Sequence, residues 1–245
     1  MKPISTILAA AIFSASNLFA FDQSHQKFTD LLTDTATLNG VKYTELKKEH
    51  AALKAYLKDL NAVTKEEFTG WSGDEQLAFL INLYNGSTLN LVLDHYPIKS
   101  FKEEIGGDKG PWKIGSVSVF GQTITLDFLE NSWIRKSYKE PRIHFALNCA
   151  SAGCPVLRAE AYTAKKLGTQ LESQTRVFFA NVKANNLKGN TLTLSPIFDW
   201  YGEDFVKKSG SVEAFVNPYF QSKEIKKGSV KITYSDYGWG LNDVK

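Results

Sequence analysis

The stretch EQLAFLINLYNGSTLNLVLDHYP, residues 75–97, decides how this chain folds. As a helix it would carry apolar side chains on nearly every side, and a helix of that kind is buried inside a core. Ser72 is a candidate N-cap before it, and Pro97 ends it. Asn82, Tyr84 and Asn85 lie within the helix, so their polar groups must find partners inside the protein.

The segments around this helix predict both helices and hairpins. Apolar residues recur at helical spacing in four further segments, residues 43–61, 163–182, 199–210 and 211–220. Two look-alike segments, VSVFGQTITLDF (residues 117–128) and NNLKGNTLTLSP (residues 185–196), alternate around a Gly-Gln or Gly-Asn turn and predict β-hairpins.

Three shorter segments complete the expected fold. Residues 126–136 predict a helical turn, RIHFAL (residues 142–147) a short strand, and residues 230–243 a strand followed by an aromatic loop. No Pro-, Gly- or Ser-rich linker divides the chain. We therefore expect a single α+β domain over residues 22–245, with several helices packed on a small, mainly antiparallel sheet with β-hairpins.

The first twenty residues are typical of a secretory signal peptide. Lys2 is followed by an apolar run over residues 4–13 and then by small and polar residues up to Ala20. The run is too short to cross the ~30 Å core of a bilayer as a helix. We expect a periplasmic or secreted protein, with residues 1–20 removed and no membrane span after cleavage.

Composition and charge exclude several classes of function. The 245 residues are 43% hydrophobic and 22% charged, as in ordinary globular proteins. A formal charge of +3 without a basic run does not predict a nucleic-acid partner. The glycines of GGDKG (residues 106–110) lack the spacing of a phosphate-binding loop, and no cofactor is implied.

Both cysteines of the chain lie in PRIHFALNCASAGCP, residues 141–155, and three interpretations of them are open. Cys149 could be a nucleophile at the junction of a strand and a loop. Cys149 and Cys154 could form a disulfide, because export places them where disulfides persist. The cysteines could bind a metal, but C-x₄-C with one nearby histidine is a weak zinc pattern, and we predict no metal.

The expected strand places His144 and Asn148 on one face and Cys149 on the other. A direct pair between Cys149 and His144 then requires the chain to turn at Asn148, which the small residues of ASAG favour. Elsewhere, Glu130, Arg135 and Arg142 predict a structural ion-pair set or an anion site, with structure favoured. The aromatic residues are expected to be mostly core, with some lining a groove: Trp112, Trp200, Trp239, Tyr201 and Tyr237.

Five collinear motifs together resemble the family called domain of unknown function 547 (DUF547). They are AFLINLYNGSTLN (residues 78–90), ENSWIR (130–135), RIHFALNCASAGCPVLR (142–158), DWYGEDF (199–205) and YGWGLN (237–242). The resemblance extends over essentially the whole chain after the leader. It implies a similarity to papain-like or transglutaminase-like cysteine enzymes, with Cys149 as the nucleophile.

The chain departs from the family pattern at one position. Asn131 stands where the family has a histidine, and the Asn side chain cannot take a proton from a thiol. A cysteine enzyme that relied on that histidine would be inactive in this protein, or would have to recruit His144 or His95 instead.

Two functions from different classes follow. The first is a cysteine-dependent acyl-transfer enzyme or amide hydrolase, in which Cys149 attacks, His144 handles the proton and amides after Cys149 hold the oxyanion. Its catalytic candidates are Cys149, His144, Asn148 and Glu130, and its cleft candidates are Asn82, Tyr84, Asn85, Asn131 and Arg142. The alternative is a non-catalytic envelope protein that binds a peptide-like or small-molecule ligand, with Cys149 and Cys154 oxidised to a disulfide.

Overall fold

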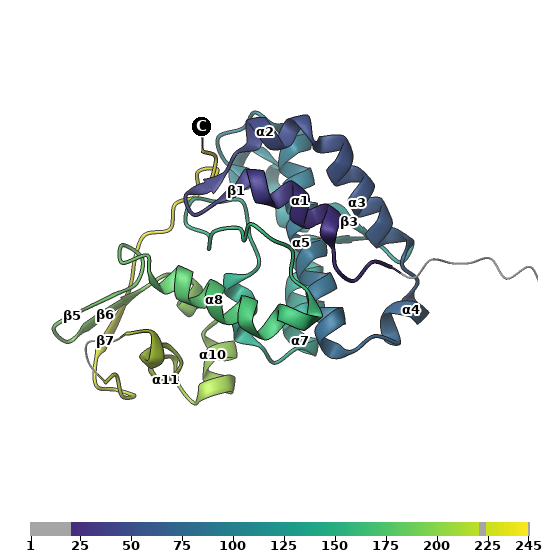
Figure 1. The fold of residues 1–245 in the computed structure, drawn as a ribbon. Coiled ribbons are helices and arrows are strands. Elements are labelled where there is room, and N and C mark those ends of the chain that lie inside the picture. The colour runs from purple at the N-terminus through teal and green to yellow at the C-terminus, as the bar shows by residue number, and fades with distance from the viewer. Residues whose placement is uncertain (1–20, 221–223, 245) are drawn as a thin grey trace, which may run out of the picture.

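The computed structural model describes residues 21–220 and 224–244 (Figure 1). The signal peptide expected over residues 1–20 lies outside the described residues. At the centre is α5 (Gly73–His95), in which every residue from Leu77 to Leu89 is buried. Ser72 and Glu75 form a capping box at its start, with Ser72 N–H donating to Glu75 Oε2 at 2.8 Å. The prediction of a buried helix capped by Ser72 is confirmed.

Helices from the N-terminal part of the chain pack around α5. They are α1 (Gln26–Thr35), α2 (Tyr43–Lys48), α3 (His50–Ala62) and α4 (Lys65–Thr69). The single amphipathic helix expected over residues 43–61 is therefore two helices, which meet at Glu49. Together with α5, these helices hold most of the larger of two hydrophobic clusters.

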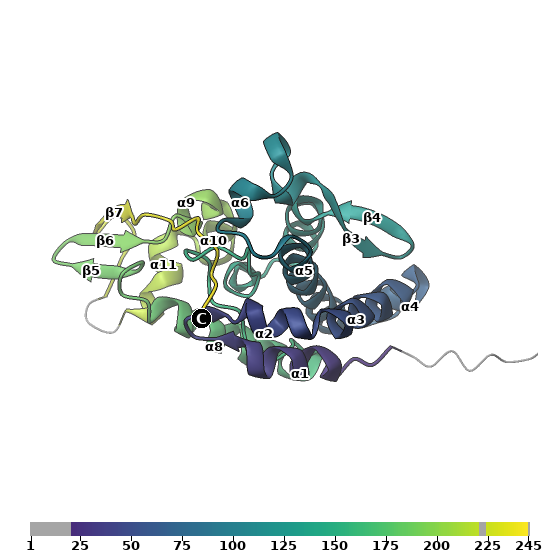
Figure 2. The same cartoon turned by 90° about the horizontal axis from the view of Figure 1, so that it is seen from above.

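The second cluster lies on the other side of the molecule, where the C-terminal helices meet a sheet (Figures 1 and 2). Phe145 and Phe198 are almost fully buried within it. The helices on this side are α8 (Leu167–Phe179), α9 (Ile197–Trp200), α10 (Gly202–Ser209) and α11 (Val212–Val216). Short helices elsewhere are α6 (Phe101–Glu104), α7 (Arg135–Ser137), and 3₁₀ turns at Gly107–Lys109, Pro111–Lys113, Ala164–Lys166 and Asn217–Tyr219.

The strands form three small sheets. Antiparallel pairs join β1 (Ala36–Thr37) to β2 (Gly40–Val41) and β3 (Gly115–Val119) to β4 (Gln122–Thr125). The third sheet has the order β5 (Asn186–Lys188), β6 (Thr191–Leu194), β7 (Lys231–Tyr234), with β6 and β7 parallel. Both predicted hairpins and the α+β fold class are confirmed. No helix in the described part of the chain is both long and apolar enough to cross a membrane.

The strand expected at RIHFAL is wrong, because Pro141–Phe145 is a 3₁₀ helix. Proline at its first position fits a helix start, and the Glu140 side chain accepts from Arg142 N–H at 3.1 Å. Every residue from Ile143 to Asn148 is buried, so the apolar pattern of the segment carries no period that could separate a strand from a helix. The face assignments made for His144 and Cys149 do not apply.

The C-terminal tail runs back across the molecule and pairs with the cysteine loop, residues 148–154. Ala152 N–H donates to Gly240 O at 2.7 Å, and Gly153 N–H donates to Gly238 O at 2.9 Å. Asn242 then joins the tail to β2, because its carbonyl accepts from Val41 N–H at 2.8 Å. The tail therefore holds the cysteine loop against the N-terminal helices.

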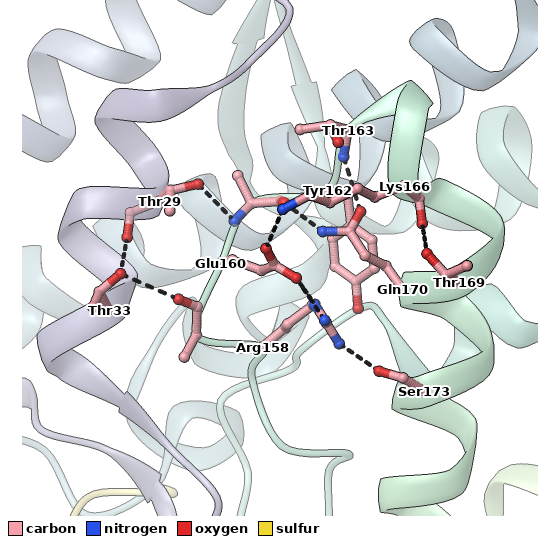
Figure 3. Close-up of polar contacts among 12 residues, drawn as sticks. Thr29, Thr33, Arg158, Glu160, Tyr162, Thr163, Lys166, Thr169, Gln170 and Ser173 are labelled. Carbon is pink, nitrogen blue, oxygen red and sulfur yellow. Dashed lines mark hydrogen bonds and ion pairs between the residues drawn. The ribbon is translucent and has the colours of Figure 1, made fainter.

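The segment after the cysteine loop is held between α1 and α8 (Figure 3). Thr29 of α1 accepts from Ala161 N–H at 3.1 Å, while Gln170 of α8 donates to Ala161 O at 2.8 Å and accepts from Thr163 N–H at 3.0 Å. Because helices on both sides satisfy its backbone groups, this segment anchors the downstream end of the cysteine loop.

Candidate functional site

Buried amides on α5 fix both ends of the segment that carries Cys149. Asn85 accepts from Asn148 N–H at 2.8 Å and donates to Ala146 O at 3.0 Å. One turn earlier, Asn82 accepts from Tyr162 N–H at 2.9 Å and donates to Tyr162 O at 2.8 Å. Each side-chain amide thus provides hydrogen-bond partners for buried backbone groups of the loop that no helix or sheet pairs.

The loop bends sharply directly after Cys149. Ala150 has a φ of 60°, a left-handed conformation that costs energy for a residue with a Cβ atom. Asn148 supports the bend, since its Oδ1 accepts from Ala150 N–H at 3.0 Å and its Nδ2 donates to Pro155 O at 2.8 Å. Strain of this kind concentrates at functional sites, and here it adjoins the cysteine.

Hydrogen-bond donors surround the Cys149 thiol. Its Sγ lies 3.2 Å from the Tyr237 hydroxyl. A hydrogen bond from the Cys154 thiol and a second from Tyr237 lower the pKa of Cys149 to about 7, although its burial acts in the opposite direction. Burial and the neighbouring Cys149 raise the pKa of Cys154, so Cys154 is the protonated member of the pair.

The two cysteines are close together and both are free thiols in the structure. Cys154 Sγ lies 2.8 Å from the amide nitrogen of Cys149. Near neutral pH about half of the molecules therefore hold Cys149 as a thiolate, with the Cys154 thiol donating to it.

The Cys149 thiol faces a cavity of about 280 Å³. Its aromatic lining residues are Tyr84, Trp112, Trp200, Tyr201, Tyr237 and Trp239. Its other lining residues include Asp127, Glu130, Asn131, His144, Cys149 and Cys154. The rings of Trp200, Tyr237 and Trp239 pack together, with centroids 4.7–5.7 Å apart. A cavity with one apolar wall and a few converging polar groups is typical of a small-molecule or substrate site.

A chain of polar contacts crosses the cavity wall at His144. The imidazole stacks on Tyr201 at 4.0 Å between centroids, and its Nε2 lies 2.8 Å from Asp204 Oδ2. Burial alone would raise the pKa of Asp204, but hydrogen bonds from His144 and Arg135 hold it well below its usual range. Asp204 is therefore ionised at neutral pH and fixes the orientation of the ring.

Asn131 continues this chain of contacts. Arg135 donates to Asp204 Oδ2 at 2.7 Å and to Asn131 Oδ1 at 2.7 Å, while Asn131 Nδ2 donates to Asp127 Oδ1 at 3.0 Å. Asn131 thus links a cation and a carboxylate, and its amide cannot act as a base.

Glu130 is buried on the π-helix Phe128–Ile134, next to the buried Tyr84 and the half-buried Tyr201. Burial raises the pKa of Tyr201, and the charge and hydrogen bond of Glu130 raise it further. Burial and then Glu130 raise the pKa of Tyr84 in the same way. Both phenols are therefore protonated donors at neutral pH.

The structure brings six of the sequence-predicted site residues to one cavity, namely Cys149, Cys154, His144, Glu130, Tyr84 and Asn131. It places the others elsewhere. Asn82, Asn85 and Asn148 hydrogen-bond to buried backbone groups, as described above. Arg142 donates to both carboxylate oxygens of Glu140, at 2.7 and 2.8 Å, outside the cavity.

The sequence did not single out Asp204 and Asp127, although Asp204 lies in the motif DWYGEDF. Tyr237 was among the aromatic residues expected in the core or along a groove, and it lines the cavity. Within the described residues, no group of three or more His, Cys, Asp or Glu side chains is arranged to hold a metal ion.

The fold and the site together define a helical α+β protein with a cysteine-containing, aromatic-walled cavity. The family model described as "Protein of unknown function, DUF547" matches residues 68–179, which include α5, the cysteine loop and α8, and this match supports assignment to that family. Searches of curated proteins and of solved structures found no match.

Proposed function

We propose that this protein is an exported, cysteine-dependent acyl-transfer enzyme or hydrolase that acts on a peptide- or amide-like substrate. The observation that carries the proposal is the Cys149 thiol, whose pKa is lowered to about 7 where it faces a cavity of about 280 Å³. A thiol with that pKa is about half thiolate at neutral pH, and the thiolate is the nucleophile. Export rests on the N-terminal sequence alone.

The reaction proceeds in two steps. The Cys149 thiolate attacks the substrate carbonyl carbon, a C–S bond forms, and the carbonyl electron pair moves to oxygen. When the carbonyl re-forms, the C–N bond breaks and the leaving amine takes a proton from His144. Water or a second amine then attacks the thioester, His144 accepts a proton from it, and Cys149 leaves as a thiolate.

His144 suits this role because Asp204 orients it. A carboxylate on one ring nitrogen fixes the tautomer and stabilises the imidazolium that forms during proton transfer. Among the described residues, the second ring nitrogen of His144 has no hydrogen-bond partner. Cys149, His144 and Asp204 would then share the roles of nucleophile, acid–base and orienting residue.

Of the loop amides expected from the sequence, the Ser151 N–H is a candidate oxyanion donor, because its hydrogen bond to Cys149 helps to lower the pKa of that thiol. Other amides of the loop are occupied. Ala150 N–H donates to Asn148, and the amides of Ala152 and Gly153 donate to the C-terminal tail. The Tyr237 hydroxyl is a further donor, because burial raises the pKa of this phenol and so keeps it protonated, and its oxygen lies 3.2 Å from the sulfur. Once the C–S bond has formed, the hydroxyl is free to donate to the oxyanion.

A second candidate is the non-catalytic binding protein in which Cys149 and Cys154 are joined. The observation that favours it is the closeness of the pair, with Cys154 Sγ 2.8 Å from the Cys149 amide. In an oxidising compartment such a pair can become a disulfide. Oxidation would remove the nucleophile and leave the aromatic-walled cavity as a ligand site.

An activated ester tests the first candidate without knowledge of the substrate. The protein is mixed with p-nitrophenyl acetate, quenched with acid and weighed intact by mass spectrometry. We expect a burst of p-nitrophenol and one added acetyl group on Cys149. Neither should occur in Cys149→Ser, while Cys154→Ser should still be acetylated. Acetylation that persists in Cys149→Ser, or no acetylation of the reduced wild type, would refute the enzyme proposal.

A further inference from the structure

A second cavity, of about 860 Å³, adjoins the catalytic one. Asn131 lines both cavities, and Asp204, which bonds to His144 in the first, lines the second. The second cavity is formed by α7, the turn that follows it and the end of α10. A substrate bound at Cys149 could therefore continue into it without leaving the protein surface.

The charges in this second cavity are unbalanced. It is lined by five cations, Arg135, Lys136, Lys139, Lys207 and Lys208, and by two carboxylates, those of Glu140 and Asp204. Both carboxylates are already occupied, since Glu140 accepts from Arg142 and Asp204 accepts from Arg135 and His144. Asn131 Oδ1, also in the lining, accepts from Arg135, so the lining holds no carboxylate without a partner for the lysines.

Three of these lysines lack a partner. Lys207 lies 2.9 Å from the exposed carboxylate of Glu203. Lys136, Lys139 and Lys208 have no carboxylate within ion-pair distance among the described residues, and all three are exposed. Cations gathered in one concave site attract anions more strongly than the same cations spread over a surface.

We infer that this cavity, the basic groove, binds the carboxylate-bearing segment of an acidic peptide whose scissile or reacting amide lies at Cys149. The inference rests on the proposed function and names its substrate class. Lysine ammonium groups serve as flexible point charges and suit side-chain carboxylates at varied spacing. Nucleic acid fits less well, because Tyr138 is the groove's one aromatic residue among those described, and its hydroxyl bonds to Gln76.

The test measures binding apart from catalysis. Every protein carries Cys149→Ser, which leaves the basic groove intact. Fluorescence anisotropy is followed with three labelled probes of equal length, hexaglutamate, hexaglutamine and hexathymidylate. We expect hexaglutamate to bind most tightly, and its affinity to fall as salt is raised.

Two triple variants with the same loss of charge locate the site. Lys136→Gln, Lys139→Gln and Lys208→Gln together should weaken hexaglutamate binding by about tenfold, since each exposed ion pair contributes modestly. The matched control replaces three exposed lysines outside the groove, Lys58→Gln, Lys183→Gln and Lys188→Gln, and should leave binding within about twofold.

The inference is overturned if both triple variants weaken binding equally, if hexaglutamine binds as well as hexaglutamate, or if hexathymidylate binds more tightly than either peptide. Failure here is distinguishable from failure of the proposed function. Acetylation of Cys149 by a small ester does not use the basic groove, so a reactive Cys149 without hexaglutamate binding would overturn the substrate class alone.

Discussion

Replacing Tyr237 with phenylalanine should raise the pKa of Cys149 and leave the cavity wall in place. The change removes the hydroxyl 3.2 Å from Cys149 Sγ, while the ring keeps its packing against Trp200 and Trp239. A hydrogen bond to a charged group contributes about 1.5–3 kcal/mol, and 1.36 kcal/mol corresponds to one pKa unit. Because water can partly replace the hydroxyl at this half-buried thiol, the low end applies. We expect a rise of about one unit, from about 7 to about 8.

The assay is the rate of alkylation of Cys149 by iodoacetamide between pH 5 and 10, with peptide fragmentation separating Cys149 from Cys154. At pH 6 the thiolate fraction should fall by about tenfold in Tyr237→Phe. The rate should fall by about three- to tenfold, because a more basic thiolate is a better nucleophile. Near pH 10, where Cys149 is ionised in both proteins, Tyr237→Phe should react as fast as the wild type or up to about threefold faster. Tyr234→Phe, a change at an exposed tyrosine on β7, is the matched control. An unchanged midpoint in Tyr237→Phe would refute the assignment of Tyr237 as a thiolate donor.

Three further changes test the supports of the site. Gly153→Ala would place a Cβ atom 2.8 Å from Gly238 N and 2.9 Å from the Tyr237 ring. Thermal denaturation should therefore show a lower Tm. Because Tyr237 would be displaced, Cys149 should also be alkylated more slowly at pH 6. Asn85→Ala leaves two buried backbone groups unpaired and should cost about 2–4 kcal/mol in urea denaturation; a loss below about 1 kcal/mol would contradict its bracing role. Asp204→Asn should slow acyl transfer by at least about 100-fold with alkylation of Cys149 little changed; equal loss of both would refute an orienting role.

The spacing of apolar residues and the cap and turn residues predict the helices and hairpins that short-range contacts stabilise. The helix α5 follows from its apolar residues and the Ser72 cap, and the hairpins follow from alternation around Gly121 and Gly189, which both have the positive φ that their turns require. RIHFAL failed for the opposite reason. All of its residues after Arg142 are buried, so the choice between strand and 3₁₀ helix is made by packing and not by period.

The sequence predicts only some of the residues of the site, for a similar reason. Cys149 and His144 lie five residues apart, and their residue types alone point to nucleophile and base. Asp204 and Tyr237 lie 60 and 88 residues from their partners in the sequence. They reach the cavity only because α10 packs beside the 3₁₀ helix and the tail pairs with the cysteine loop. No local pattern encodes contacts of that range.

The most direct test of whether Cys149 is a reactive nucleophile is its rate of alkylation in protein that is recovered without reductant from its own compartment. Samples are treated briefly with iodoacetamide at pH 6, with and without prior reduction, and weighed intact. We predict one rapid label on Cys149 in the unreduced sample, because its pKa is lowered, and none on Cys154, whose pKa is raised. No label before reduction, and labels on both cysteines after it, would contradict the proposal of a cysteine-dependent enzyme and favour the disulfide-bonded binding protein.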